Sequence, residues 1–99
     1  MPQKCVVKTM ARRYGYMVSS NGNNKGFVLR YGSPAPSLSI CGFIYALNEH
    51  IKDQKLDGKF PPAKYNGKYA HTKARIGMVS YDIKFGAGSI IVEYKVHKQ

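Results

Sequence analysis

Acidic residues are scarce in this sequence. Its 99 residues hold only 5 Asp and Glu against 16 Lys and Arg, which gives a formal net charge of +11. Hydrolases with two catalytic carboxylates and nucleases with two metal ions need acidic side chains gathered at one site. Asp53, Asp57 and Asp82 form no recognisable cluster of that kind. The sequence therefore argues against both enzyme classes.

Cysteine and histidine are also few. Cys5 and Cys41 are not enough for a disulfide scaffold, and they form no C-x-x-C motif. Together with His50, His71 and His97 they show none of the ligand spacings that are typical of zinc sites. No phosphate-binding loop precedes a helix either. We therefore expect no metal site and no cofactor.

Long hydrophobic runs are missing. The most apolar stretch, 38–47, has about ten residues and contains Ser39 and Gly42, whereas a bilayer span needs roughly 20. This excludes a membrane-spanning helix and predicts no membrane partner. Residues 1–8 contain no signal-peptide core. With so few cysteines, the sequence predicts a cytoplasmic protein, acting in its own cell or in the cytoplasm of a host.

The composition is otherwise that of a folded protein. Hydrophobic residues make up 43% of the chain and aromatic residues 12%, which predicts a single α+β domain over residues 1–99. Alternating apolar residues predict strands at 4–10, 13–19 and 27–31, with a hairpin between the second and third.

A helix and a second hairpin complete the predicted fold. Ile40, Phe43, Ile44, Leu47 and Ile51 recur at helical spacing, which predicts an amphipathic helix over about 38–55. Alternating apolar residues then predict strands at 79–85 and 90–96 around a Gly-Ala-Gly turn. The resulting order is β-β-β-α-β-β, a five-stranded antiparallel sheet with one helix packed on one face.

The positive charge has a predicted location. A single helix cannot cover both sides of the sheet, so one face is left open. If the strand registers are right, the basic residues opposite the apolar positions are Lys4, Lys8, Arg13, Arg30, Lys84 and Lys95, with Asp82 and Glu93 among them. The helix is close to neutral, because Lys52 and Lys55 are balanced by Glu49 and Asp53.

Residues 58–75 form a second basic stretch, which we interpret as a loop without regular structure. It contains no acidic residue, and its cations are Lys59, Lys64, Lys68, Lys73 and Arg75. Phe60, Tyr65 and Tyr69 each follow one of these lysines. Ammonium groups contact phosphates and aromatic rings stack on bases, which is how flexible nucleic acids are bound.

These observations favour a non-enzymatic protein that binds RNA or DNA through the phosphate backbone. One alternative is a small accessory or inhibitor protein, such as viruses and mobile elements encode, that docks on an acidic protein or nucleoprotein surface. A second alternative is a small basic ribonuclease using His71. A homodimer is also possible, and because like-charged faces repel, it would pair through the helix or through strand 89–96 as a free edge.

Overall fold

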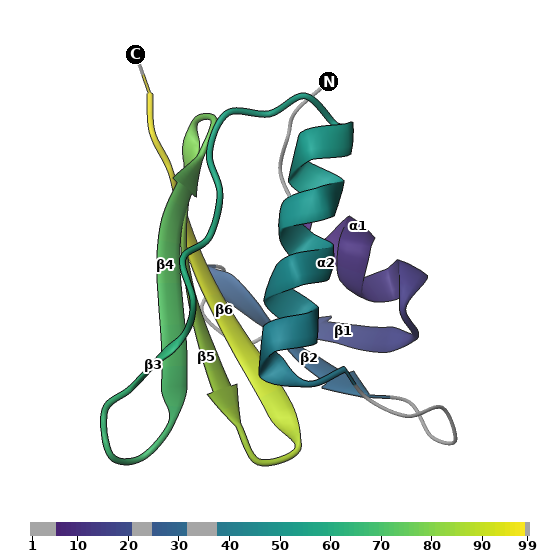
Figure 1. Ribbon diagram of the computed structural model, residues 1–99, viewed down its shortest axis with the longest axis vertical. Helices are drawn as coiled ribbons and strands as arrows, with labels where there is room; N and C mark the ends of the chain where they lie inside the picture. Colours follow the sequence, from purple (N-terminus) through teal and green to yellow (C-terminus); the bar gives the residue numbers. More distant parts are fainter. Residues whose placement is uncertain (1–5, 21–24, 32–37, 99) are drawn as a thin grey trace.

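The computed structural model describes residues 6–20, 25–31 and 38–98, and it shows an α+β fold (Figure 1). Two helices lie on one face of a six-stranded antiparallel sheet. The elements in chain order are α1 (Val6–Arg13), β1 (Tyr16–Ser20), β2 (Gly26–Tyr31), α2 (Ile40–Asp53), β3 (Lys64–Tyr65), β4 (Ala70–Ile76), β5 (Val79–Gly86) and β6 (Ser89–Val96). The expected fold class is confirmed, whereas the expected numbers of strands and helices are wrong.

The strands are ordered β1-β2-β6-β5-β4-β3 in the sheet. Both predicted hairpins are present: β1 pairs with β2, and β5 pairs with β6 along its whole length. The strand at 89–96 pairs with β2 on one side and β5 on the other. It is therefore an interior strand, paired on both sides over 90–93, and the expectation of an edge strand there is wrong.

The first element differs in kind from the prediction. Residues 6–13 form helix α1 where we expected a strand over 4–10. Val6, Val7, Met10 and Ala11 are all buried, and only a helix brings these spacings to one side. Burial against α2 and β1 thus outweighs the strand preference of the β-branched residues. Gly15 ends the turn after α1 with a φ of 91°.

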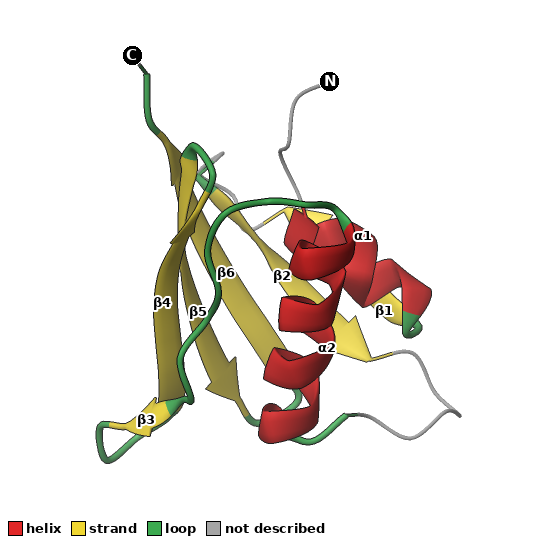
Figure 2. Ribbon diagram, turned by 45° about the horizontal axis from the view of Figure 1, so that its top comes forward, coloured by secondary structure: helices red, strands yellow, loops and turns green. Residues whose placement is uncertain are grey.

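Helix α2 is close to its prediction but shorter than 38–55 at both ends. Ser39 caps its N-terminus, where the Ser39 hydroxyl accepts a hydrogen bond from the Gly42 amide at 3.0 Å. At the other end, the backbone amide of Leu56 donates to the Ile51 carbonyl and Lys55 has a φ of 58°, which is a Schellman-type ending. Helix α2 lies against the sheet (Figure 2). Its buried residues include Phe43, Leu47 and Ile51.

Residues 64–76 are the second departure from the prediction, because β3 and β4 lie where we expected an irregular loop. The core-facing residues of β4 are Ala70, Thr72, Ala74 and Ile76, most of them small or polar. Their hydropathy alternates only weakly, so the strand pattern is hidden in the sequence. The segment 59–63 packs over this part of the sheet, which leaves room only for small side chains.

The segment between α2 and β3 is held at three points. The Asn48 side chain of α2 accepts from the Phe60 amide at 2.8 Å and donates to the Phe60 carbonyl at 3.0 Å. The Thr72 hydroxyl of β4 donates to the Pro61 carbonyl at 2.8 Å. Gly58 has a φ of 124°, and a Cβ there would lie 2.4 Å from the Arg75 carbonyl oxygen. These contacts tie the segment to both the helix and the sheet.

Candidate nucleic-acid interface

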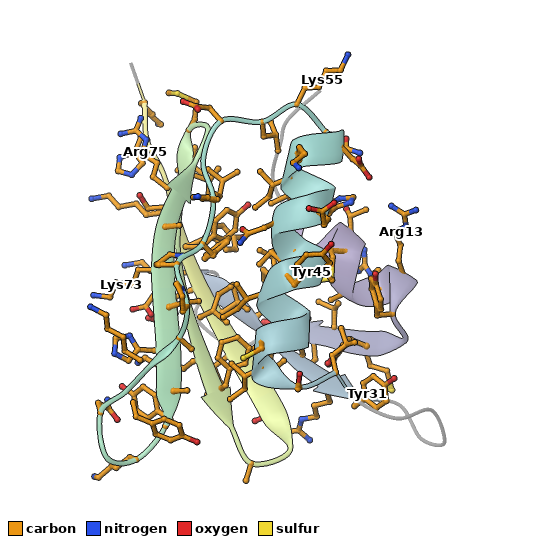
Figure 3. All side chains as sticks on the ribbon, viewed as in Figure 1. Arg13, Tyr31, Tyr45, Lys55, Lys73 and Arg75 are labelled. Carbon is orange, nitrogen blue, oxygen red and sulfur yellow. The ribbon has the colours of Figure 1, made fainter. Side chains whose placement is uncertain are left out.

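The face of the sheet opposite the helices, which we call the open face, carries a cluster of cations. Lys73 and Arg75 from β4, Lys84 from β5 and Lys95 from β6 share this face, and the labelled Lys73 and Arg75 point away from α2 (Figure 3). Residues two apart on one strand are separated by about 6.7 Å, and neighbouring strands by about 4.8 Å. Cations from three adjacent strands are therefore gathered in one patch.

Two further predicted residues complete this cationic face. Lys64 of β3 lies opposite His71 of β4 in the register, which places it on the same side as Lys73. Arg30 of β2 lies opposite Met17 at the other end of the sheet, again on the open face. The predicted site residues on the open face are thus Arg30, Lys64, Lys73, Arg75, Lys84 and Lys95. Tyr69 lies at the edge of this face, where its ring approaches Lys84 and also lines a cavity on the helix side. The strand positions predicted for Arg30, Lys84 and Lys95 are confirmed.

An aromatic group lies beside the cations. The Lys84 ammonium nitrogen is 5.6 Å from the centroid of the Tyr69 ring, and the Tyr69 and His71 rings are 6.0 Å apart at 68°. His71 pairs with Lys84 across β4 and β5. A half-buried tyrosine ring and an ammonium group are therefore adjacent, one suited to stacking and the other to a phosphate.

Acidic residues interrupt the open face at one row. Asp82 of β5 lies between Lys73 of β4 and Glu93 of β6 in the register. Oδ1 of Asp82 is buried and accepts no hydrogen bond from the described residues. Lys73 likewise forms no ion pair with any residue that the structure describes. This row therefore places two carboxylates among the cations of the open face.

Lys8 and Arg13 are not on the open face, so their predicted placement on the sheet is wrong. Both belong to α1, because residues 6–13 are helical, and α1 lies on the other side of the sheet. The Lys8 ammonium nitrogen is 5.1 Å from the centroid of the core-facing Phe27 ring. Lys4, predicted on the same face, lies outside the described residues.

Arg13 is instead a neighbour of a buried histidine. Its Nη1 atom lies 3.5 Å from Nδ1 of His50 on α2. Burial lowers the pKa of His50 below its ordinary value, and the Arg13 charge lowers it further, whereas Asp53 raises it. His50 is thus held neutral at the contact between the two helices.

The remaining candidate residues of the stretch 58–75 lie away from the open face. Phe60 is only 2% exposed and packs at 6.1 Å from the Tyr81 ring, so it is unavailable as a base-stacking residue. Tyr65 pairs with Ala70, which places it on the helix side of β3. Lys59 and Lys68 are exposed, but they border cavities on that same side. These four residues do not join the open face.

The sequence pattern did not indicate that the second basic stretch and the predicted sheet face form one surface. Lys73 and Arg75 alternate with Thr72 and Ala74, and this alternation was the available signal for β4. The same signal would have placed His71 beside them. The sequence indicates His71 only as a catalytic candidate, whereas its place in the register is next to Lys84 and Lys64.

Comparison with models of known families, with curated proteins and with solved structures finds no match to this chain. Within residues 6–20, 25–31 and 38–98, no helix is both long and apolar enough to cross a membrane. In the same residues, His, Cys, Asp and Glu side chains form no group of three or more that is placed to hold a metal ion. We therefore infer the function from the residues on the surface of the protein.

Proposed function

We propose that this protein binds nucleic acid non-enzymatically, through phosphate contacts on the open face of its sheet. The observation that carries the proposal is the convergence of Lys73, Arg75, Lys84 and Lys95 from three adjacent strands. Phosphate neutralisation by such cations supplies most of the affinity in sequence-independent binding, because it releases counterions from the nucleic acid. A total charge of +11 adds long-range attraction.

Single-stranded RNA or DNA suits the geometry better than a duplex. The cations follow the line of β4 and β5 at about 6.7 Å intervals, and the Tyr69 ring lies at the end of that line beside Lys84. An extended strand can lay its phosphates along the lysines and stack a base on Tyr69. No helix among the described residues projects from this face to enter a groove of a duplex.

The test is a fluorescence-anisotropy titration of a labelled single-stranded oligonucleotide at several salt concentrations. We expect log affinity to fall linearly with log salt, with a slope of about −0.7 for each neutralised phosphate. The variant K73Q/K84Q should bind more weakly and should reduce the magnitude of the slope by about 1.4. The matched control is K52Q/K55Q, which removes the same charge from the exposed side of α2 and the turn that follows.

Equal losses in the two double variants would show that only net charge matters and would contradict the proposed face. Binding that does not depend on salt, or no binding at low salt, would also overturn the proposal. The titration further tests the non-enzymatic assignment, because the oligonucleotide should remain intact. Cleavage that disappears in His71→Ala would support the ribonuclease alternative instead.

Stacking is tested separately. Tyr69→Ala should weaken single-strand binding by about 1–3 kcal/mol, which is the contribution of one base stacked on one ring. Tyr14→Ala removes an exposed tyrosine just after α1, on the other side of the sheet, and should leave the affinity unchanged. Equal effects of the two substitutions would exclude a specific stacking role for Tyr69.

A further inference from the structure

The helix side of the molecule carries an apolar groove that the proposed nucleic-acid interface does not use. It has a volume of about 710 Å³. One wall is α2, which contributes Ile40, Cys41, Ile44 and Tyr45, and the other is the segment 59–63. Tyr65 of β3 lies at its end. We call this cavity the helix-side groove.

Large aromatic side chains are exposed on the α2 wall and at the end of the helix-side groove. Tyr45 is 68% exposed on α2, and Tyr65 is 78% exposed on β3. Figure 3 shows Tyr45 on the side of α2 that faces the viewer. Exposed apolar residues scattered singly need no explanation, but here they border one cavity together with Pro61 and Pro62. Such a cluster is typical of an interaction site.

The walls are fixed in place before any partner arrives. Asn48 bonds both backbone groups of Phe60, and Thr72 bonds the Pro61 carbonyl. The buried Phe60 ring anchors the same segment in the core. Because this segment is already ordered, little conformational entropy of the protein is lost when a ligand binds in the groove.

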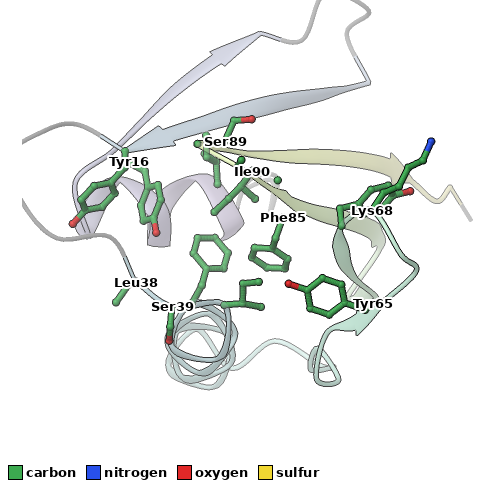
Figure 4. A pocket seen from close by; sticks show the side chains of 16 residues that line it. Tyr16, Leu38, Ser39, Tyr65, Lys68, Phe85, Ser89 and Ile90 are labelled. Atoms are coloured by element: carbon green, nitrogen blue, oxygen red, sulfur yellow. The ribbon is translucent and has the colours of Figure 1, made fainter.

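A second, smaller cavity lies beside the helix-side groove, at the N-terminus of α2. This cavity has a volume of about 440 Å³ and shares Ile40 and Tyr65 with the groove. The Tyr65 ring points into it, toward Phe85 and the start of α2 (Figure 4). Tyr65 therefore lines both cavities, and substitution of its side chain changes both.

The charges around these cavities are of one sign. Lys59 borders the groove and Lys68 borders the smaller cavity, and the lining of both contains no acidic residue. The acidic residues of α2, Glu49 and Asp53, border a different cleft with Arg13. An apolar floor with basic edges complements a ligand that is apolar and acidic.

We propose that the helix-side groove binds a short extended peptide segment of a partner protein, rich in aromatic or aliphatic side chains and flanked by Asp or Glu. The groove wall from Ile40 to Asn48 is about 12 Å long, since a helix rises 1.5 Å per residue. An extended peptide covers this length with about four residues. A second copy of this chain is a poor occupant, because it brings another +11 and only 5 acidic residues.

The experiment is a selection from a displayed library of random 12-residue peptides on the purified, nuclease-treated full chain. We expect the selected peptides to be enriched in acidic and large apolar residues. Their dissociation constants, measured by fluorescence anisotropy on synthetic peptides, should rise at least about tenfold in Tyr45→Ala and in Tyr65→Ala. Lys59→Gln should weaken binding by about threefold, with an effect that shrinks at high salt.

Two controls decide where the peptides bind. Tyr14→Ala removes another exposed tyrosine, outside the groove, and should have no effect. The variant K73Q/K84Q changes only the open face, so it should weaken oligonucleotide binding and leave peptide binding intact. Failure of one proposal therefore does not imply failure of the other. Both tyrosine variants alter exposed side chains, and their thermal unfolding should match that of the wild type.

Several outcomes would overturn the proposal. Selection of basic or polar peptides would contradict the charge argument, and failure to enrich any peptide would contradict the groove itself. Peptides that bind Tyr45→Ala and Tyr65→Ala as well as the wild type would show that they bind elsewhere. Concentration-dependent dimerisation that is lost in Tyr45→Ala would instead identify a second copy of the chain as the occupant.

Discussion

The two sides of the sheet differ in how they use exposed residues. The open face carries long cationic side chains, and the Tyr69 and His71 rings lie beside Lys84 at its edge. The helix side carries the exposed tyrosines Tyr45 and Tyr65 at an apolar groove, with Lys59 and Lys68 at the edges of the groove and of the neighbouring cavity. A charged sheet surface suits a long polyanion, whereas an apolar cavity suits a few side chains of a protein.

One short hairpin contributes to both sides. Lys64 and Tyr65 are adjacent on β3, yet the register places Lys64 opposite His71 on the open face and Tyr65 opposite Ala70 on the helix side. A strand points successive side chains to opposite faces, so two neighbouring residues serve different surfaces. A basic, aromatic stretch of sequence can therefore contribute residues to two different surfaces.

The largest effect should come from Gly58, where the groove wall meets the open-face strand β4. Gly58→Ala should lower the free energy of unfolding by about 3 kcal/mol, because a Cβ at a φ of 124° would lie 2.4 Å from the Arg75 carbonyl oxygen. Gly67→Ala is the control, since its φ is 97° but nothing lies within 4 Å of the added Cβ. It should cost only about 1–2 kcal/mol. Urea denaturation measures both, and equal costs would contradict the close contact.

Asn48 tests whether the two sides can be separated. Asn48→Ala leaves the amide and carbonyl of Phe60 without their partners, so it should lower the free energy of unfolding by about 2 kcal/mol. The loosened wall should also weaken peptide binding, while oligonucleotide affinity should stay at the wild-type value. Asn66→Ala removes similar bonds in an exposed turn and should cost about 1 kcal/mol or less. Weakened oligonucleotide binding in Asn48→Ala would show that the sides are coupled.

The charge of Asp82 tests whether electrostatic attraction acts locally at the open face. Asp82→Asn removes a carboxylate from the middle of the open face and should strengthen oligonucleotide binding by roughly threefold at low salt, as expected for one repulsion at about 7 Å in a water-like dielectric. Asp53→Asn makes the same change of net charge on the helix side. An equal gain there would mean that only total charge governs binding. Anisotropy titrations of the two variants decide this.

The smallest effect we expect is a pH dependence on the helix side. Because the folded protein holds the pKa of His50 below its ordinary value, the unfolded chain binds a proton more readily. The stability contributed by neutral His50 is complete above about pH 6.5, the ordinary histidine value, and is lost as the pH falls below it. The groups that face the imidazole are Arg13 at the end of α1, Tyr14 in the turn that follows, and Glu49 and Asp53 on α2.

The measurement compares urea denaturation at pH 7.5 and pH 5.5 in the wild type and in His50→Gln. The wild type should lose more stability on acidification than the variant does. An identical loss in both would show that His50 does not cause the pH dependence. Oligonucleotide binding at the open face serves as a check that the variant is folded.

Local patterns in the sequence predicted a large part of this fold. The alternation in 79–85 and 90–96 is strong because its core-facing residues are large and apolar, and the resulting hairpin is present as expected. The helical spacing of Phe43, Leu47 and Ile51 predicted helix α2 equally well, and all three residues are buried. From these elements alone, the open-face positions of Lys84 and Lys95 could be predicted correctly.

Helix α1 and strand β4 could not be found in the same way. The run Val6-Val7-Lys8-Thr9 has the β-branched composition of a strand, and it is helical because Val6, Val7, Met10 and Ala11 pack together on α2 and β1. In β4, small core-facing residues suit the overlying segment 59–63 and erase the usual hydropathy signal. In both cases a contact between distant residues outweighs the local preference.

In the candidate site, too, some properties follow from the sequence alone and others depend on tertiary packing. Composition alone was sufficient to identify a surplus of positive charge, since charge is a property of each residue wherever it lies. Three-dimensional packing was needed to bring Lys73 and Arg75 beside Lys84 and Lys95, and to place Lys64 and Tyr65 on opposite sides of the sheet. Which face a side chain occupies depends on strand register, and register is set by distant partners in the sheet.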